Sequence, residues 1–288
     1  MTDPAHGPVP APVLAAVDIG TNSVHMVVAR VDGEGRMEIL AKEKEMVRLG
    51  RSAGDMKELA PDAIDRGVAA LRRCQRVASA HGAEVAAVAT SAVREAHNRR
   101  TFLDRAWDEA GVSVEVISGF EEARLIHLGV LQALPIFDQR ALLCDIGGGS
   151  TEVLLGQRGD VLASRSFRLG AIRLTERFLT HSRLKPSHVE ACRQHAESVL
   201  APFGAEVRDA GHDVVVGASG TIETVVAMAL AARGASGGRT LNGQRVHADE
   251  VTAVVESLAA APDPDARAEL PGADPKRADI LLGGAVIL

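Results

Sequence analysis

Short apolar runs alternate along the chain with longer segments in which apolar residues recur every three or four positions. The short runs predict strands, and the longer segments predict amphipathic helices. The predicted strands are 13–17, 24–31, 85–89, 114–117, 141–146, 152–155, 161–167 and 214–216. The predicted helices are 58–80, 101–110, 119–134, 171–179, 187–203, 221–232 and 248–260. The interleaving of the two kinds of element indicates an α/β fold.

One pattern occurs twice: an apolar run, the letters Asp-Ile-Gly, a small polar turn and a second apolar run. The first copy is VDIGTNS at residues 17–23, and the second is CDIGGGSTE at residues 144–152. Because the copies lie in opposite halves of the chain, they predict two related lobes that face each other, joined near residues 134–139. We therefore expect an N-terminal lobe over 13–136 and a C-terminal lobe over 137–288, after a disordered tail at 1–12.

Composition and net charge argue against several classes of protein. Of the 288 residues, 46 % are hydrophobic but only 2 % are aromatic, so the core is built mainly from Ala, Val, Leu and Ile. A net charge of −6 argues against a DNA-binding or other nucleic-acid-coating protein and against binding to anionic membranes. Cys74, Cys144 and Cys192 are far apart and odd in number, which is typical of reduced thiols in a cytoplasmic protein. The start of the chain lacks the basic segment of a signal peptide, and no apolar run approaches the roughly 20 residues of a membrane span.

The two Asp-Ile-Gly turns contain residue types that suit phosphate chemistry. Asp18 and Asp145 end buried strands, so their carboxylates are expected to point out of the sheet toward a ligand. Glycines after each Asp let the backbone approach that ligand and expose N–H groups to phosphate oxygens. The turn at 147–150 has neither the ending of a Walker loop nor a dinucleotide fingerprint, and it is expected to join two strands in a hairpin. A plain glycine hairpin without function is the simpler alternative.

A third glycine turn, GASGT at residues 217–221, follows a short predicted strand and opens a predicted helix. The N-terminus of a helix exposes amide groups and favours anions. Gly217, Gly220 and Thr221 are therefore candidate phosphate-binding residues, with an ordinary strand-to-helix turn as the alternative.

Two adjacent glutamates begin the helix predicted at 119–134. Ser118 followed by Glu121 forms the pattern of a capping box, in which Glu121 reaches back to its own helix end. Glu122 has no such local duty, so it is the candidate for a base that acts on water.

Six motifs together give a specific resemblance. In order along the chain they are DIGTNS at 18–23, ATSAVREAHN at 89–98, ISGFEEARLI at 117–126, DIGGGSTE at 145–152, GASGT at 217–221 and PKRADILLGGAVIL at 275–288. From about residue 13 to its end the chain resembles the exopolyphosphatase/guanosine-pentaphosphatase family. That resemblance implies an α/β fold of two actin-like (ribonuclease H-like) lobes flanking a phosphate-binding cleft. It also implies a hydrolase that releases terminal phosphate from inorganic polyphosphate, guanosine pentaphosphate or both.

The resemblance implies roles position by position. Glu122 matches the family's general base, and Asp145 and Glu152 match acidic residues associated with Mg²⁺, for which Mn²⁺ could substitute, and with the attacking water. Phosphate-cradling positions are matched by Gly147, Gly148, Gly149 and Ser150 in the second turn and by Asp18, Thr21, Asn22 and Ser23 in the first. Arg94 matches an arginine that holds a substrate phosphate.

The end of the chain departs from the family pattern. Many relatives continue past the RADI segment, and the longer ones add a helical domain, whereas this sequence stops at Leu288 in what looks like a helix. Truncation of the C-terminal lobe is therefore one expectation, and processivity on long substrates is in doubt. A homodimer is left open.

Several arginines could form a track for a polyanionic substrate, because the planar guanidinium binds two phosphate oxygens at once. They are Arg48, Arg51, Arg94, Arg99, Arg100, Arg168, Arg173 and Arg277. For each of them except Arg94, a solvated surface charge is the favoured interpretation.

Two other functions remain open. One is a non-catalytic sensor of polyphosphate or of guanosine pentaphosphate, and the other is an actin-like ATP-dependent kinase. The acidic set of Glu122, Asp145 and Glu152 argues against the sensor, because polyanion binding gains nothing from carboxylates without a metal.

Overall fold

The computed structural model describes residues 11–51, 57–181, 184–235 and 240–288. The expected disordered tail lies, up to residue 10, outside the described residues. The chain divides into two compact units, the first holding the described residues up to Ile117 and the second running from Ser118 to Leu288. The lobe boundary expected at 136/137 stays a prediction.

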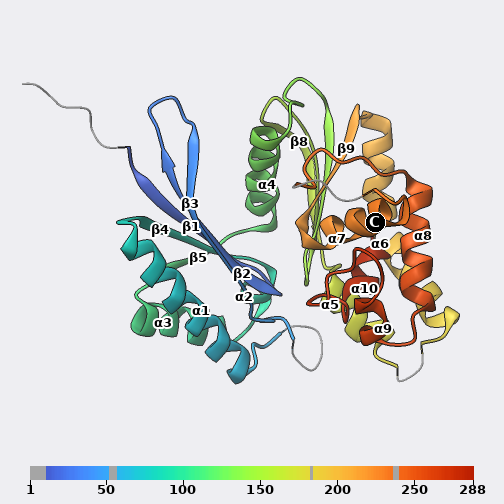
Figure 1. The fold of residues 1–288 in the computed structure, drawn as a ribbon, viewed down its shortest axis with the longest axis horizontal. Helices are drawn as coiled ribbons and strands as arrows, with labels where there is room; N and C mark the ends of the chain where they lie inside the picture. The colour runs from blue at the N-terminus through green and yellow to red at the C-terminus, as the bar shows by residue number, and fades with distance from the viewer. Residues whose placement is uncertain (1–10, 52–56, 182–183, 236–239) are drawn as a thin grey trace, which may run out of the picture. The chain divides into compact units, whose positions relative to one another are not determined.

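The first unit is a five-stranded mixed sheet with helices against one face (Figure 1). Its strands are β1 (Val13–Ile19), β2 (Ser23–Val31), β3 (Met37–Met46), β4 (Glu84–Ala89) and β5 (Val114–Val116), in the order β3-β2-β1-β4-β5. Its helices are α1 (Pro61–Ala80), α2 (Ser91–Glu95) and α3 (Arg99–Ala110). Buried apolar residues alternate along β1 and β2 and form one core with the apolar sides of α1 and α3.

The second unit is a four-stranded sheet with helices on both faces (Figure 1). Its strands are β6 (Ala141–Ile146), β7 (Thr151–Gln157), β8 (Asp160–Phe167) and β9 (Val214–Ala218), in the order β8-β7-β6-β9. One face is covered by α4 (Gly119–Ala133). On the other side of the sheet lie α5 (Ala171–Leu174), η1 (Thr175–Leu179), α6 (Pro186–Ala210), α7 (Ser219–Ala232), α8 (Ala248–Ala260), α9 (Pro264–Ala268) and α10 (Leu281–Ala285), of which α6 and α7 pack on the strands and α8 packs on α7 and α10.

The internal repeat in the sequence is a repeat of topology. In each unit, three antiparallel strands are followed by helical structure and then by a fourth strand that runs parallel to the first. The helical part is α1 in the first unit and α5, η1 and α6 in the second. The turn geometry repeats as well, because Gly20 N–H donates to the Ser23 carbonyl at 3.0 Å and Gly147 N–H donates to the Ser150 carbonyl at 2.9 Å. The predicted α/β class and the hairpin at 147–150 are confirmed.

Several elements differ from the pattern-based prediction. β3 was not predicted, because its sequence MEILAKEKEM alternates charges where a buried strand would be apolar. It is an edge strand, and charges on an edge discourage pairing with other chains. The helix predicted over 171–179 is a short α5 followed by a π-helical turn, η1, and the helix predicted over 187–203 continues past Pro202 to Ala210.

Within the part of the chain that the structure describes, every helix is too short or too polar to cross a lipid bilayer. Cys74, Cys144 and Cys192 are free thiols, and burial raises the pKa of each.

Candidate active site

The glycine turn between β6 and β7 is held by its carbonyl groups. The Gly147 carbonyl accepts from Ala171 N–H at 2.9 Å, and the Gly148 carbonyl accepts from Ile172 N–H at 2.9 Å. The Gly149 carbonyl accepts from the Arg173 side-chain Nε–H at 2.9 Å. In a trans peptide the C=O and the following N–H point in opposite directions. The amides of Gly148, Gly149 and Ser150 therefore point away from α5, which is the arrangement of an anion-binding nest.

Gly170 is the position where this anchoring requires a glycine. A Cβ placed on Gly170 would lie 2.4 Å from the Gly148 carbonyl oxygen and 2.6 Å from Gly149 N. Both atoms belong to backbone and have little freedom to shift. The start of α5 therefore comes so close to the turn that no side chain fits between them.

Three carboxylates gather beside this turn. Asp145 and Glu152 are directly opposite in the antiparallel pair of β6 and β7, so their side chains share one face of the sheet. That face is the one packed by α4, since Leu143 and Leu154, two residues away on the same strands, belong to the core under α4. Glu122 lies in the first turn of α4 and acts electrostatically on Glu152.

Glu152 has the most perturbed environment of the three. It is only 3 % exposed, and burial raises its pKa to about 8, with the negative charge of Glu122 as the next cause and that of Asp145 as a smaller one. Ser166 Oγ–H donates to Glu152 Oε1 at 2.7 Å, and hydrogen bonds from Ser166 and Ser150 hold the pKa lower than burial alone would. A cation at this place would relieve the part of the pKa shift that comes from repulsion between the carboxylates.

The donor set fits Mg²⁺ or Mn²⁺ but is not a complete cage. Among the described residues, no group of three or more His, Cys, Asp and Glu side chains is arranged to hold a metal ion by itself. Mg²⁺ commonly takes only one or two carboxylates and completes its shell with water and substrate phosphate. Asp145 and Glu152 supply oxygen ligands of that kind from neighbouring strands.

Glu121 and Glu122 have different surroundings. The difference does not come from the capping box that the sequence predicts for Glu121. Ser118 Oγ accepts from Glu121 N–H at 3.1 Å, so Ser118 is the N-cap as predicted. The Glu121 carboxylate instead receives two hydrogen bonds from Arg124, at 2.7 and 2.8 Å, and this pair lowers the pKa of Glu121. The predicted hydrogen bond from the Glu121 carboxylate back to its own helix end is therefore wrong. A guanidinium one turn along the helix binds both carboxylate oxygens instead.

The start of α7 has a strained backbone. Ser219 has φ of 88°, which is rare for a residue with a side chain, and among the described residues its buried Oγ has no hydrogen-bond partner. Gly217 leaves room for Ile222, whose Cγ2 would lie 2.5 Å from an added Cβ. Thr221 is buried against Gly284. Packing thus accounts for Gly217 and Thr221, and their phosphate roles stay predictions.

Arg277 lies against this turn and is not a surface charge. A Cβ placed on Gly220 would lie 2.3 Å from the Arg277 guanidinium. The whole Arg277 residue is only 8 % exposed. Burial lowers the pKa of Arg277, and the negative charges of Asp274, Glu223 and Asp145 oppose that effect. The interpretation of Arg277 as solvated is therefore wrong, because its guanidinium is buried against Gly220 at the start of α7.

The first glycine turn, at residues 20–23, is held by residues of the first unit. Thr21 Oγ shares a hydrogen bond of 2.7 Å with Ser91 Oγ, and Ser23 Oγ shares one of 2.8 Å with His25 Nε2. Asn22 is buried, with Nδ2 4.0 Å from Met46 Sδ, and Asp18 ends β1 on an exposed position. These side chains hold the turn, so the phosphate contacts expected of it fall mainly to its amides and stay predictions.

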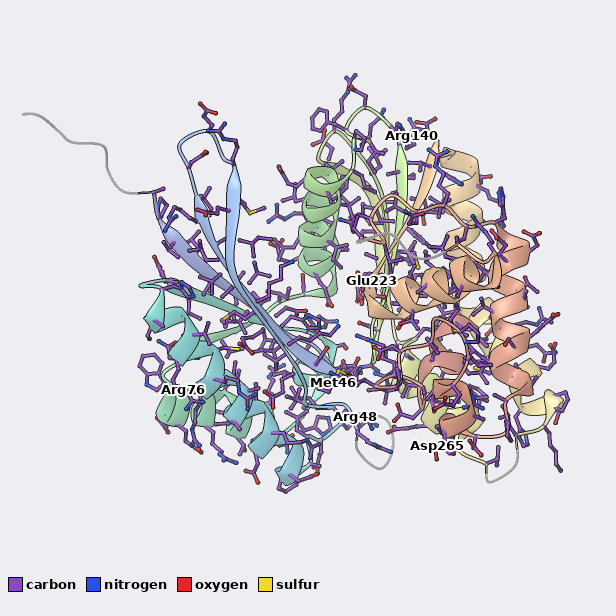
Figure 2. All side chains as sticks on the ribbon, viewed as in Figure 1. Met46, Arg48, Arg76, Arg140, Glu223 and Asp265 are labelled. Carbon is purple, nitrogen blue, oxygen red and sulfur yellow. The ribbon has the colours of Figure 1, made fainter. Side chains whose placement is uncertain are left out.

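Arg94 belongs to α2, three residues after Ser91, whose hydroxyl contacts Thr21 in this turn. It is half-buried, and one of its guanidinium nitrogens, Nη1, donates to the Ile117 carbonyl at 3.0 Å. The bond to Ile117 gives Arg94 a structural role, and the substrate role stays a prediction. Among the other arginines, Arg51, Arg99, Arg100 and Arg168 are exposed as expected. Arg48 lies two residues beyond the end of β3 (Figure 2). It is half-buried and has φ of 50°.

Three residues with unusual surroundings were not candidates from the sequence. Ser166 is opposite Glu152 in the pair of β7 and β8, so only strand register brings it to the acid. Ser219 is inside a noticed motif, but its positive φ depends on the tertiary turn. His127 stands on α4 among apolar residues and is fully buried.

His127 has no hydrogen-bond partner for either ring nitrogen among the described residues. It packs on Gly156 of β7, where an added Cβ would lie 2.5 Å from the imidazole Cε1. Burial lowers the pKa of His127, and the charge of Asp160 opposes this only partly. A buried polar group without a partner costs about 1–3 kcal/mol.

We expect His127→Leu, a change of similar volume, to raise the free energy of unfolding at neutral pH. Because the pKa is lower in the folded state than the unfolded value of 6.5, stability is lost as the pH falls below about 6.5. The variant should show a shallower loss between pH 7 and 5 in denaturant unfolding. His212→Leu, at an exposed position, is the control, and an equal pH dependence in wild type and His127→Leu would contradict the assignment.

The chain is similar to known proteins both in sequence and in fold. A model of the Ppx/GppA phosphatase family matches residues 27–288. The chain belongs to the Ppx/GppA phosphatase family. An exopolyphosphatase structure from Cytophaga hutchinsonii has a TM-score of 0.86 and 28 % identity, over 96 % of this chain and 88 % of that one. A Ppx/GppA family member from Aquifex aeolicus has a TM-score of 0.78 and 26 % identity, over 96 % and 89 %.

These Ppx/GppA structures share the two-sheet α/β architecture, so the expected actin-like fold is confirmed. A curated relative from Photobacterium profundum, named guanosine-5'-triphosphate,3'-diphosphate pyrophosphatase, is 35 % identical over 222 residues. The match covers 77 % of this chain and 44 % of that protein, so the chain spans less than half the length of this relative.

Proposed function

We propose that this chain is a phosphohydrolase that releases terminal phosphate from inorganic polyphosphate or guanosine pentaphosphate by metal-assisted attack of water. One observation carries the proposal: three carboxylates gather beside a glycine turn whose amides all point to one side. Pure anion binding would not place carboxylates there. The names of the Photobacterium and Cytophaga relatives indicate the substrate class.

The chain's own groups divide the reaction between them. The amides of Gly148, Gly149 and Ser150 bind the oxygens of the terminal phosphate and remain in place as charge develops. Glu122 takes a proton from the attacking water. Asp145 and Glu152 would hold Mg²⁺, which supplies charge neutralisation at the phosphate when bound.

The remaining site residues are proposed as substrate contacts. In the first unit these are Asp18, Thr21, Asn22, Ser23 and Arg94, and in the second unit Gly217, Gly220 and Thr221. The three free thiols fit a reducing compartment, and we propose a cytoplasmic location.

The test is phosphate release from polyphosphate, guanosine pentaphosphate and ATP, measured in parallel with and without Mg²⁺. We expect Mg²⁺-dependent release from one or both of the first two and much less from ATP. Binding of polyphosphate with no release from any substrate would instead identify a sensor. Transfer of the ATP γ-phosphate to an acceptor would identify a kinase.

A further inference from the structure

The two glycine turns offer an internal comparison of how their carbonyls are anchored. Gly149 in the second turn occupies the place of Asn22 in the first, since each precedes the Ser that closes the turn. The Asn22 carbonyl accepts from the backbone amides of Val47 and Arg48, at 3.1 and 2.8 Å. The preceding carbonyls, of Thr21 and Gly148, also receive backbone amides. The same carbonyl positions are therefore held in both units.

Only one of these anchors comes from a side chain rather than from the backbone. In the second unit the Gly149 carbonyl accepts from Arg173 Nε–H at 2.9 Å, and Arg173 is half-buried in α5. The Nε–H of arginine has a fixed direction within a rigid plane, so the bond orients as well as attracts. Orienting the Gly149 carbonyl also orients the Ser150 N–H, because both belong to one peptide plane.

We propose that Arg173 is a positioning residue that aims the Ser150 amide at the bound phosphate. This inference rests on the proposed phosphate role of the turn. Arg173 acts through the peptide plane of Gly149 and Ser150, and its charge is secondary. The positioning of this peptide plane also bears on Glu152, because Ser150 donates a side-chain hydrogen bond to that carboxylate. Loss of the anchor loosens the phosphate grip in the ground state and in the transition state alike.

The test compares Arg173→Met, which removes donor and charge, with Arg173→Lys, which keeps the charge but lacks the planar Nε–H. The control is Arg177→Met, one turn further along at an exposed position over Phe178. Each variant is assayed for KM and kcat on polyphosphate, for inorganic phosphate binding by calorimetry in Mg²⁺, and for melting temperature. We expect both Arg173 variants to raise KM and the phosphate Kd about tenfold, which is the effect of one hydrogen bond to a charged group. Arg177→Met should match the wild type.

The outcomes separate the possible errors. Full rescue by Arg173→Lys would mean that Arg173 acts by its charge on the substrate, which overturns the positioning role. If the wild type is active and Arg173→Met has the same KM and phosphate Kd as Arg177→Met, the positioning role is also overturned. The proposed function then stays intact. A wild type that neither binds phosphate nor hydrolyses polyphosphate overturns the proposed function itself, and the Arg173 inference with it. If Arg173→Met fails to fold, the Arg173→Lys result decides.

Discussion

Replacement of Glu122 by Gln is expected to leave the fold and ligand binding intact and to lower kcat by about 10²- to 10⁴-fold, equivalent to about 3–5 kcal/mol of barrier. The reason is that Gln is close to Glu in shape but accepts no proton from water. Glu122 is half-buried in the first turn of α4 and close enough to Glu152 to perturb it. The measurement is single-turnover phosphate release together with polyphosphate affinity.

The matched control is Glu121→Gln, the neighbour on the same helix turn. Its carboxylate is bound by Arg124 at the surface, and surface ion pairs contribute little to stability. We expect Glu121→Gln to keep most of the turnover and nearly the same melting temperature. Equal loss of activity in both variants would show that the assignment of roles within the pair is wrong.

Removal of the metal, or of its proposed ligand Asp145, is expected to abolish most activity. Charge stabilisation by a bound divalent ion contributes several kcal/mol, so Asp145→Asn should lose about 10²-fold or more in rate. Excess chelator should have the same effect, and added Mg²⁺ or Mn²⁺ should restore the wild type. Because Glu152 would remain as a proposed ligand, the variant should need a higher Mg²⁺ concentration for half-maximal activity.

Asp209→Asn, on an exposed position of α6, serves as the control for loss of one acidic charge. It should keep the wild-type Mg²⁺ dependence. Full turnover of the wild type in excess chelator would rule out a metal-assisted mechanism and leave Asp145 and Glu152 without a role in binding a cation.

Much of the site could be predicted from the sequence because its signals are local. The repeated Asp-Ile-Gly turn fixes a hairpin with small residues, and the structure shows the same Gly-to-Ser hydrogen bond in both copies. The choice of Glu122 over Glu121 followed from local helix-end chemistry, although the partner of Glu121 is Arg124 and not the helix cap. Neither choice needed contacts between distant segments.

Other features depend on contacts between residues far apart in the chain. Arg277 looks like a surface charge in sequence, yet its guanidinium lies against Gly220, which is 57 residues earlier, because the C-terminal segment folds over the start of α7. Ser166 meets Glu152 only through the register of β7 and β8. Arg173 reaches the Gly149 carbonyl only because Gly170 lets α5 approach the turn.

The sequence alone therefore determined the α/β class, the doubled turn and the acidic residues beside it, since each is set by neighbours within a few positions. The tertiary structure decided which groups tune that site: the burial that raises the pKa of Glu152, the anchors of the glycine turn, and the orphan nitrogens of His127. Burial and hydrogen-bond direction are properties of packing between elements, and no periodicity within one element encodes them.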